Sequence, residues 1–448
     1  MVWPEALVRL ATALHRAGGQ VYLVGGALRD LLLGRTPRDF DLATDLLPEQ
    51  TLRVAQAHGW RAVPTGIRFG TVTVWQGDLP VEVTTFRSES GYRDGRRPDE
   101  VVFGVSIERD LARRDFSINA MALSWPEGIF VDPWQGVNDL HRGLIRAVGE
   151  PGERFREDGL RMLRAIRLAG ELDFTVEPAT FLAVSCHCEG ILRVARERVG
   201  AEMDRLMTAP AAVHGLQQLF RSGLGFVLLP EFLPCLGFPQ DPAYHAHPVL
   251  EHILEVVRLT PSDRVLRWAA LFHDVAKPYC ATRAADGRMH FHGHDRMGAR
   301  ILEHVLRNLR MERSLIESAG QLVVHHMFPL DMGDRGLRRM LARLGGKNLF
   351  RLVHLKLADM VGSGGTFVPQ AFDAWSEFHH RCELLIRETT ALTVRDLAID
   401  GHDIMRILSI PPGPRVGRIL RTLLEEVLEN PELNERSWLI ERLQTIDH

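Results

Sequence analysis

The chain has 448 residues, few cysteines, little net charge and no long apolar run. Five cysteines, an odd number without a regular framework, argue against a disulfide scaffold and indicate a reducing compartment. No apolar run approaches the roughly 20 residues that a membrane-spanning helix needs. Residues 1–19 form an amphipathic helical pattern with charges throughout, which is unlike a signal peptide. We therefore expect a cytoplasmic protein without a membrane partner.

The small net charge of −3 argues against binding to nucleic acid through overall charge. Any contact with RNA has to come from local basic faces. Arginine, which suits phosphate groups and base edges, supplies most of the cations. Hydrophobic residues make up 45% of the chain, as in an ordinary globular protein. The length predicts several domains rather than a single core.

The first recognisable chemistry follows the apolar run 21–24, which predicts a buried strand. Gly25 and Gly26 allow the backbone to turn tightly and to approach a ligand closely. A helix is expected over 27–33, with Arg29 in its first turn. Free N–H groups at the start of a helix favour the binding of phosphate, and an arginine beside them adds a bidentate hydrogen-bond donor. The pattern therefore indicates a turn that holds phosphate.

Two carboxylates follow this turn. Residues 39–42 are expected to form a second strand, and side chains two positions apart on a strand share a face. Asp39 and Asp41 then point the same way, and neighbouring carboxylates repel each other unless a cation lies between them. A site with few oxygen ligands suits Mg²⁺, which keeps waters and takes substrate phosphates. We expect this pair to hold Mg²⁺ and to serve phosphoryl or nucleotidyl transfer. Ordinary surface acids are the alternative.

The glycine turn and the paired aspartates, at this spacing, resemble the nucleotidyltransferase superfamily that includes DNA polymerase beta. More narrowly, they resemble its class II branch, the bacterial tRNA nucleotidyltransferases (CCA-adding enzymes) and bacterial poly(A) polymerases. The resemblance implies that the 3′-hydroxyl of tRNA attacks the α-phosphate of CTP or ATP. It places Gly25, Gly26, Arg29 and Arg114 on the triphosphate.

Two further strands are expected at 70–76 and 80–87, joined as a hairpin. Glu82 lies on the second strand, and the resemblance implies that a glutamate here is close to the metal site. We expect Glu82 to be a third catalytic carboxylate; a solvent-facing glutamate is the alternative. Residues 88–100 are polar and glycine-rich, which predicts a surface loop. In the resembled family this loop switches addition from C to A, and its full length leans against an enzyme that adds only C.

Residues 110–122 hold an Arg-Arg-Asp cluster ahead of an apolar helical pattern. Arg114 can reach a triphosphate, and Asn119 can hydrogen-bond a ribose hydroxyl. The segment closely matches the family's Arg-Arg-Asp-Phe-x-x-Asn-Ala motif. The resemblance therefore implies that Arg114, Asp115 and Asn119 lie at the nucleotide. Read without it, a basic pair before a helix is a solvated surface.

A second chemical cluster lies at 154–169. Asp158, Arg161, Arg164 and Arg167 recur every three residues, which predicts a slowly winding stripe on one helix. A carboxylate accepts from an amino group and a guanidinium donates to a ring nitrogen, so one such pair suits cytosine and adenine but not uracil or guanine. The match to the family's Glu-Asp-x-x-Arg motif implies this role for Asp158 and Arg161. The other two arginines are expected to hold phosphates or to orient this pair. A solvated amphipathic face is the alternative.

The pattern beyond residue 146 is helical to the end of the chain. Glu197 and Arg198 resemble the family's last neck motif and are expected to brace the arginine stripe. The segment 331–356 is helical and rich in arginine. It is expected either to follow an RNA backbone or to form an exposed helical face.

Histidines gather in the second half of the chain. Adjacent His273 and Asp274 lie inside an apolar helical pattern, and histidine and carboxylate ligands together suit a divalent transition metal. The pattern resembles the HD superfamily of metal-dependent phosphohydrolases. This resemblance implies His252, His273, Asp274 and Asp359 as the core ligands, with His247 competing for the first place. Buried structural histidines are one alternative, and an HD fold that binds metal with little activity is another.

The resemblance covers nearly the whole chain and implies an α+β fold. It consists of a polymerase-beta-like nucleotidyltransferase head with a small mixed sheet, followed by an all-α neck, an HD domain and a tail. We expect the head at 1–146, the neck at 147–210, the HD domain at 211–385 and a tRNA-binding tail at 386–448. The expected activity is template-independent addition of CCA to the 3′ end of tRNA from CTP and ATP.

Three alternatives to this activity stay open. An enzyme that adds only A shares nearly every motif. A poly(A) polymerase shares the head and neck but normally carries a basic tail, and this tail is neither long nor basic. The HD unit is the third alternative, as a phosphohydrolase acting on 2′,3′-cyclic or nucleotide phosphates with the head as an RNA-binding module. No pattern in the sequence indicates an oligomeric state.

Overall fold

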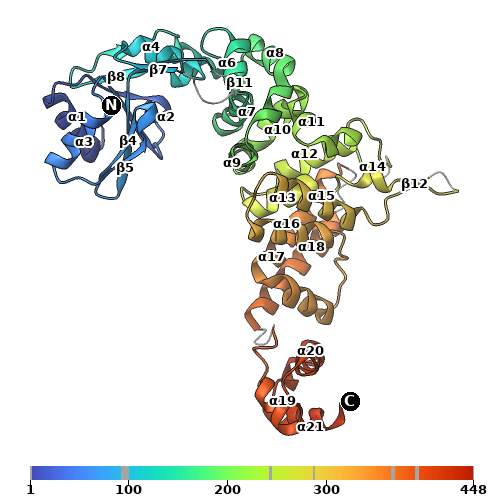
Figure 1. The fold of residues 1–448 in the computed structure, drawn as a ribbon. Coiled ribbons are helices and arrows are strands. Elements are labelled where there is room, and N and C mark those ends of the chain that lie inside the picture. Colours follow the sequence, from blue (N-terminus) through green and yellow to red (C-terminus); the bar gives the residue numbers. More distant parts are fainter. Residues whose placement is uncertain are drawn as a thin grey trace. The chain divides into compact units, whose positions relative to one another are not determined.

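The computed structural model describes residues 3–91, 100–241, 245–285, 288–364, 369–388 and 393–446. The chain divides into two compact units, Met1–Pro230 and Glu231–His448, and each is described by itself (Figure 1). Most of the loop expected at 88–100 lies outside the described residues, so the switching role implied for it stays a prediction.

The first unit contains a mixed seven-stranded sheet in the order β3-β4-β5-β2-β1-β8-β9. Strands β2 and β5 are parallel, and the other neighbours are antiparallel. The strands are β1 (Val21–Val24), β2 (Phe40–Thr44), β3 (Ala62–Gly66), β4 (Thr71–Gln76), β5 (Leu79–Thr85), β8 (Ala122–Trp125) and β9 (Phe130–Val131). Two short pairs accompany the sheet, β6 (Arg87–Ser90) with β7 (Glu100–Phe103) and β10 (Leu144–Ile145) with β11 (Thr175–Val176). The small mixed sheet predicted for the head is confirmed.

Helices accompany the sheet and continue beyond it in the first unit (Figure 1). They are α1 (Glu5–Arg16), α2 (Gly25–Leu32), α3 (Pro48–Ala57), α4 (Ile107–Ala112), α5 (Gly136–Arg142), α6 (Pro151–Glu157), α7 (Leu160–Leu172), α8 (Pro178–His187), α9 (Arg196–Met207), α10 (Ala212–Arg221) and α11 (Leu224–Leu228). Helix α2 begins two residues before its predicted start at 27. Helix α5 lies between β9 and β10.

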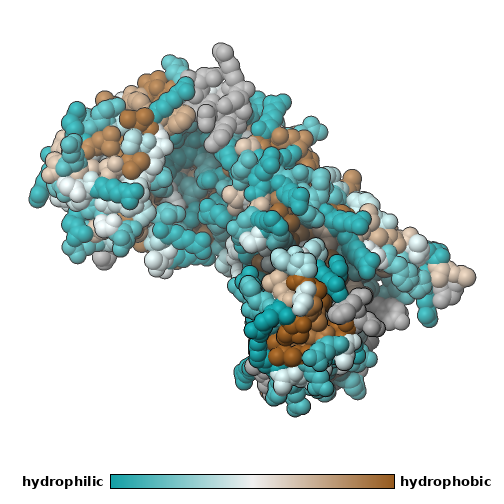
Figure 2. Space-filling model, turned by 60° about the horizontal axis from the view of Figure 1, so that its bottom comes forward, coloured by the Kyte–Doolittle hydropathy of each residue, from teal (hydrophilic) through white to brown (hydrophobic). Residues whose placement is uncertain are grey.

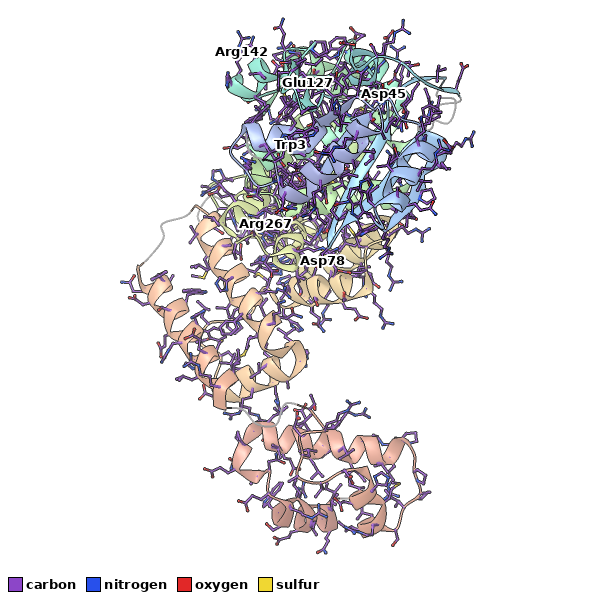
Figure 3. All side chains as sticks on the ribbon, turned by 90° about the vertical axis from the view of Figure 1, so that its left-hand side faces the viewer. Trp3, Asp45, Asp78, Glu127, Arg142 and Arg267 are labelled. Carbon is purple, nitrogen blue, oxygen red and sulfur yellow. The ribbon has the colours of Figure 1, made fainter. Side chains whose placement is uncertain are left out.

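The core of the head follows from the alternation of side chains. Val72 and Val74 on β4 and Val81 and Val83 on β5 are buried, because residues two apart on a strand share a face. Trp3 precedes α1 and is labelled in Figure 3. Its ring packs against that of Trp125 on β8, with the ring centroids 5.2 Å apart. These contacts stabilise the sheet whose strands β1 and β2 carry the site described below.

The sequence predicted Asp158 and the three arginines of the stripe on one helix, but the structure places Asp158 before the helix that carries the arginines. Helix α6 ends at Glu157 and α7 begins at Leu160, so Asp158 lies between them with an extended backbone (φ −147°, ψ 106°). Its Oδ1 accepts the Leu160 N–H at 3.0 Å. A short acidic side chain that captures a free N–H at a helix start favours a break over a continuous helix.

The second unit is helical, with one short strand pair. Its helices are α12 (Val249–Leu259), α13 (Arg264–Phe272), α14 (Lys277–Cys280), α15 (His294–Asn308), α16 (Arg313–His325), α17 (Asp334–Gly362), α18 (Pro369–Glu388), α19 (Gly401–Leu408), α20 (Pro414–Glu429) and α21 (Arg436–Thr445). The strands are β12 (Thr282–Arg283) and β13 (Met289–His290). Gly345 interrupts α17 with φ 72° and ψ 159°, a conformation reserved for glycine, so the long helix is kinked there.

Arginines on α17 contact the C-terminal end of α20. Arg338 donates to the carbonyl oxygens of Leu428 and Glu429 at 2.7 and 2.8 Å, and Arg339 pairs with the Glu429 carboxylate at 2.9 Å. Carbonyls at the end of a helix lack partners within the helix, and cations satisfy them. These arginines hold the last helices of the chain, whereas Arg343 and Lys347 of the same segment are exposed, so its expected role along an RNA backbone or as an exposed face stays a prediction.

Hydrophilic side chains cover most of the face drawn in Figure 2, and apolar side chains gather in several patches between them. Among the described residues, no helix combines the length and the apolar character needed to cross a bilayer. The helical interior instead packs its apolar residues inside each unit, as in the cluster of Ile404, Leu423, Leu439 and Leu443 at the C-terminal end.

Candidate active site and metal centre

The turn between β1 and α2 brings an acid and an arginine to the same point of the backbone. Gly25 has φ +71°, in the left-handed region that glycine adopts without strain. A Cβ atom built at this position lies 3.1 Å from Arg114 Nη1 and 3.1 Å from Asp41 Oδ2. A side chain here would crowd both groups. The missing side chain therefore keeps open the space where a phosphate could meet both the arginine and the carboxylate.

Asp39 and Asp41 lie on either side of Phe40, where β2 begins. The strand therefore starts one residue later than predicted, and Asp39 precedes it. Burial raises the pKa of Asp41 to about 6, with Arg114 opposing the rise and Glu82 and Asp39 adding repulsion. A buried carboxylate beside two other acids gains from a cation, and this donor set of oxygens fits Mg²⁺.

Glu82 lies on β5 in register with Asp41 on β2. It is exposed, and it does not line the cleft that both aspartates line. Within the described part of the chain, only two histidine-containing groups of the second unit bring three metal-ligand atoms within 4.8 Å of one another. The three carboxylates of the head are thus adjacent without forming a tight trio, and the catalytic role expected for Glu82 stays a prediction.

Polar groups around the turn form a connected network. Arg29 donates to Asn119 Oδ1 at 2.8 Å, and the Asn119 amide donates to Asp115 at 3.1 Å. Arg114 pairs with buried Asp110 at 3.4 Å. Its Nε atom is buried and has no hydrogen-bond partner among the described residues. A buried unsatisfied donor costs about 1–3 kcal/mol, so an anionic ligand at this point is favourable.

Asp115 contacts the neck rather than the open cleft. Its carboxylate pairs with Arg164 on α7 at 2.6 Å. Burial by itself would raise the pKa of Asp115, but Arg164 and the hydrogen bond from Asn119 hold that pKa well below its usual range. Asp115 was expected at the nucleotide; the structure shows it joining the strand-rich part of the unit to α7.

Asp158 and Arg161, the two residues expected to select the base, each pair with another residue and not with each other. Asp158 pairs with Arg198 on α9, with the closest N–O distance 2.6 Å. Arg161 pairs with Glu157 at 2.6 Å and donates to the carbonyl oxygen of Arg113 at 3.1 Å. The expectation that Arg198 braces the stripe agrees with its contact to Asp158. Sequence periodicity could not reveal this pairing, because the two residues are 40 positions apart.

Arg167 is almost fully buried and pairs with Glu202 and Glu171. Glu171, on the last turn of α7, also pairs with Arg205 at 3.2 Å. Its backbone carbonyl accepts from Arg35 at 3.2 Å. Glu171 therefore links α7, α9 and the loop that leads to the paired aspartates.

An open cleft of about 430 Å³ lies beside the paired aspartates, within the first unit. It is lined on one side by Gly26, Arg29, Asp30, Arg35, Arg38, Asp39, Asp41 and Asn119, and on the other by Arg164, Arg167, Glu171, Arg205 and residues 208–210. The cleft combines the paired aspartates, a glycine turn at a helix start and several arginines. Chemically, this set suits transfer of a nucleotide from a triphosphate.

The second unit brings the four predicted metal ligands together. His252, His273, Asp274 and Asp359 place one ligand atom each within 4.8 Å of the others. The Nε2 atoms of His252 and His273 are 3.2 Å apart. Their Nδ1 atoms lie 3.2 and 2.7 Å from the backbone carbonyls of Gly362 and Ala270. Backbone carbonyls that fix one ring nitrogen leave the other for a metal.

A second group shares Asp274 with the first, and the sequence analysis did not assign it. Asp274, His294 and His326 are buried and also place their ligand atoms within 4.8 Å of one another. The Nε2 atoms of His294 and His326 are 3.2 Å apart, and each Nδ1 lies 2.7 Å from a backbone carbonyl. The signal was the local pairs His294-Asp295 and His325-His326. His247, the competitor for the first place, belongs to neither group.

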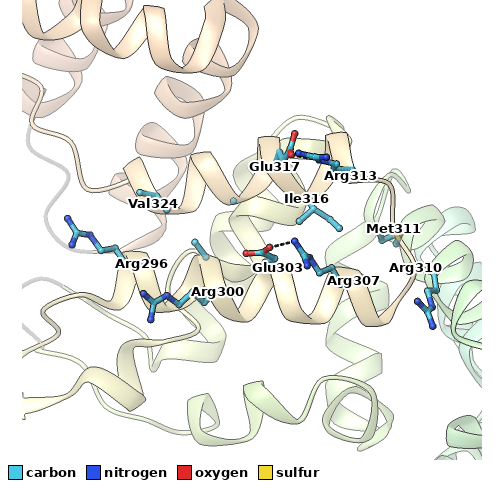
Figure 4. A pocket seen from close by; sticks show the side chains of 12 residues that line it. Arg296, Arg300, Glu303, Arg307, Arg310, Met311, Arg313, Ile316, Glu317 and Val324 are labelled. Carbon is cyan, nitrogen blue, oxygen red and sulfur yellow. Dashed lines mark hydrogen bonds and ion pairs between the residues drawn. The ribbon is translucent and has the colours of Figure 1, made fainter. Parts of the chain in front are cut away.

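A groove of about 980 Å³ lies between α15 and α16 in the second unit (Figure 4). Arg307 pairs with Glu303 on α15, and Arg313 pairs with Glu317 on α16. Ile316 extends into the groove between the helices (Figure 4). The groove contains neither of the metal-ligand groups, and its size alone does not make it the reactive site.

Comparison with known families agrees with this division of chemistry. Residues 21–146 match the family described as "Poly A polymerase head domain", and 248–360 match "HD domain". Residues 173–236 match "Probable RNA and SrmB- binding site of polymerase A". The fold and the cleft that holds the paired aspartates thus define a multidomain nucleotidyltransferase that carries an HD domain. Both domain types use divalent metal ions.

Relatives match over nearly the full length. The CCA-adding enzyme of Limosilactobacillus fermentum is 32% identical over 436 residues, covering 96% of this chain and 94% of the relative. That of Geobacillus kaustophilus is 32% identical over 448 residues, covering 98% of both. The crystal structure of the Bacillus stearothermophilus CCA-adding enzyme in complex with CTP matches with a TM-score of 0.73, 27% identity and 99% coverage of both chains. The chain belongs to the family of CCA-adding enzymes.

Proposed function

We propose that the chain adds C, C and A to the 3′ end of tRNA, with CTP and ATP as nucleotide donors. One observation carries the proposal: at Gly25, the backbone is approached at once by a catalytic acid, Asp41, and by an arginine, Arg114. Full-length membership of the CCA-adding family favours this reaction over A addition alone and over poly(A) synthesis. The RNA-binding match at 173–236 supports an RNA acceptor.

Asp39 and Asp41 would hold Mg²⁺, which lowers the pKa of the attacking 3′-hydroxyl and neutralises the leaving pyrophosphate when it is bound. Gly25 and Gly26 leave space for the triphosphate, and Arg114 offers it a buried, unused N–H. Arg29 holds Asn119, whose amide is in reach of a ribose hydroxyl in the same cleft. Each of these residues thus contributes by orienting the substrates and by its charge.

Asp158 and Arg161 would read the base edge. Each carboxylate oxygen has two lone pairs, so Asp158 can accept from Arg198 and from the amino group of cytosine or adenine together. The Arg198 guanidinium holds this carboxylate in one orientation. Uracil and guanine would present a carbonyl oxygen to the same acceptor, which leaves an unmatched pair costing about 1–3 kcal/mol. The protein alone therefore explains selection of C and A.

A direct experiment uses tRNA transcripts that end before the CCA sequence, incubated with each nucleoside triphosphate separately and together. Products resolved by one nucleotide should show two C residues from CTP alone and one further A when ATP is added. Addition of A only to transcripts that already end in CC would establish an A-adding enzyme. Long A tails would establish a poly(A) polymerase. Failure to extend any transcript would refute the proposal.

A second activity is supported by the two buried groups that share Asp274. We infer a metal-dependent phosphohydrolase in the HD domain, with a divalent transition metal held by histidine and carboxylate ligands. Assay of 2′,3′-cyclic and 2′- or 3′-phosphates with each metal added to metal-free protein tests this function. The absence of hydrolysis with every metal would leave the HD domain as a metal-binding unit only.

We also propose the domain division and the compartment that were expected from the sequence. The head at 1–146, the neck at 147–210, the HD domain at 211–385 and the tail at 386–448 would divide nucleotide transfer, base selection, hydrolysis and tRNA binding among them. All five cysteines are free thiols. Free thiols, together with triphosphate and tRNA substrates, favour the cytoplasm as the compartment.

A further inference from the structure

The cleft beside the paired aspartates extends beyond the groups assigned to the nucleotide. Gly26, Arg29 and Asn119, assigned to the triphosphate and the ribose, line part of its 430 Å³ volume together with the paired aspartates. Beyond them the cavity continues to the C-terminal ends of α7 and α9 and reaches residues 208–210. Nucleotidyl transfer brings two reactants to one pair of acids. The part of the cleft away from the nucleotide groups is therefore available to the second reactant.

We propose that Arg35, Arg38 and Arg205 form a primer rim, which binds the phosphates of the last nucleotides at the 3′ end of the tRNA. The inference rests on the proposed function, because it assigns the second substrate of the same reaction. Arg35 and Arg38 belong to the loop between α2 and β2, and Arg205 belongs to α9. All three line the cleft.

Arg38 has the clearest features of a phosphate ligand. It is exposed and immediately precedes the catalytic Asp39. Within the residues that the structure describes, it has no ion pair or hydrogen bond through its guanidinium. An exposed guanidinium next to the reacting acids, and without an acidic partner, is open to an incoming phosphate. Its position directly beside Asp39 places that phosphate near the 3′-hydroxyl.

Arg35 and Arg205 are held from behind by one residue. Arg35 Nη1 donates to the Glu171 carbonyl at 3.2 Å, and Arg205 pairs with the Glu171 carboxylate at 3.2 Å. A guanidinium has five N–H donors, so a single contact leaves others for a ligand. The Arg205 side chain is 52% exposed. Glu171 is therefore a positioning residue that holds two arginines of the rim across the cleft.

The charge of the cleft favours a polyanion once the acids carry a metal. Six arginines and four carboxylates line it: Arg29, Arg35, Arg38, Arg164, Arg167 and Arg205, with Asp30, Asp39, Asp41 and Glu171. A divalent cation on the paired aspartates cancels their charge and leaves an excess of arginines. RNA phosphates fit this excess, and each phosphate contact adds to the salt dependence of binding.

The test compares Arg38→Ala, Arg205→Ala and the control Arg53→Ala in the full-length protein. Arg53 is an exposed arginine on α3 that does not line the cleft. Binding of tRNA lacking CCA is measured by fluorescence anisotropy over a series of salt concentrations. KM values for tRNA and for CTP are measured in extension assays.

Each rim variant should weaken tRNA binding about three- to tenfold and raise KM for tRNA, with KM for CTP unchanged. The slope of log affinity against log salt should shrink by about 0.7 for each lost phosphate contact. The control should match the parent protein. With tRNA trimmed by two further nucleotides at its 3′ end, the difference between parent and rim variants should disappear.

Two results would overturn the primer rim. One is unchanged tRNA affinity and salt slope in both rim variants. The other is a raised KM for CTP with unchanged tRNA affinity, which would assign these arginines to the nucleotide or to pyrophosphate. Either result in a parent protein that still extends tRNA leaves the proposed function intact. A parent protein that extends no tRNA fails at the proposed function itself.

Discussion

At the scale of single residues, the ionisation of Asp41 links metal binding to pH. Burial raises its pKa to about 6, so below that pH a proton occupies the carboxylate that Mg²⁺ needs. Binding of the ion should therefore release about three-quarters of a proton at pH 5.5 and almost none at pH 7.5. Its apparent affinity should fall as pH falls through 6. Isothermal titration of Mg²⁺ in buffers of different ionisation enthalpy measures the released proton. Asp41→Asn should abolish the pH dependence.

The same residue gives the sharpest test of the catalytic pair. Asp41→Asn keeps the shape of the side chain but removes the charge that attracts the cation. Loss of the metal's charge stabilisation should reduce kcat for CTP addition by about a thousandfold or more. Glu82→Gln is the informative companion variant. A loss of comparable size there would make Glu82 a third catalytic carboxylate, and a loss below about tenfold would make it a neighbour only.

Arg198 controls base selection only if its ion pair with Asp158 matters. Arg198→Ala frees the Asp158 carboxylate to rotate away from the base edge. We expect about a tenfold loss of kcat/KM for CTP together with increased relative incorporation of UTP, because a carboxylate that leaves the base edge no longer opposes a carbonyl oxygen. Arg193→Ala, at an exposed arginine of the same region, should change neither. Equal losses for CTP and UTP would instead indicate a general packing defect.

At the scale of elements, the kink in α17 makes a stability prediction with a neighbouring control. Gly345 has φ 72° and ψ 159°, and nothing lies within 4 Å of a Cβ built there, so Gly345→Ala adds backbone strain without a clash. We expect a loss of about 1–3 kcal/mol in the free energy of unfolding. Gly346→Ala, whose Cβ would make an ordinary contact with Ile386 at 3.5 Å, should be neutral or stabilising by up to about 1 kcal/mol. Urea unfolding followed by circular dichroism measures both.

Elements also show what the sequence could predict and what it could not. The strands around 21–24 and 71–85 and the apolar helices followed from local patterns, because each is defined by residues near one another in the chain. The placement of Asp158 did not, because the break depends on a side chain that captures the Leu160 N–H. The partners of Asp115 and Asp158 lie 49 and 40 residues away. No periodicity encodes such pairings.

The metal-ligand groups illustrate the same limit. Adjacent His273 and Asp274 stand out in the sequence because they lie inside an apolar segment. His294 and His326 do not stand out, because each has the sequence context of an ordinary helix end. Only the packing of α15 against α16 brings those two rings to the Asp274 carboxylate. The arginines of α17 are the converse case. Their spacing indicated a basic face, but the fold turns Arg338 and Arg339 toward α20.

At the scale of the whole molecule, the two metal-dependent chemistries proposed above belong to two separate compact units. Removal of metal with a chelator should therefore stop both activities. Mg²⁺ alone should restore CCA addition, and a divalent transition metal should be needed for hydrolysis. Asp274→Asn should abolish hydrolysis and leave CCA addition within about twofold of the parent, whereas Asp41→Asn should do the reverse. Loss of both activities in either variant would show that the units depend on each other.

Gly25 and Gly34 share nearly the same backbone angle, φ +71° and +69°, but only Gly25 has groups pressed against its missing side chain. The two positions should therefore tolerate different substitutions under selection. In a saturation library grown under demand for functional tRNA, position 34 should accept asparagine and other residues that tolerate a left-handed backbone. Position 25 should stay glycine, since any replacement obstructs the acid and the arginine with a single atom.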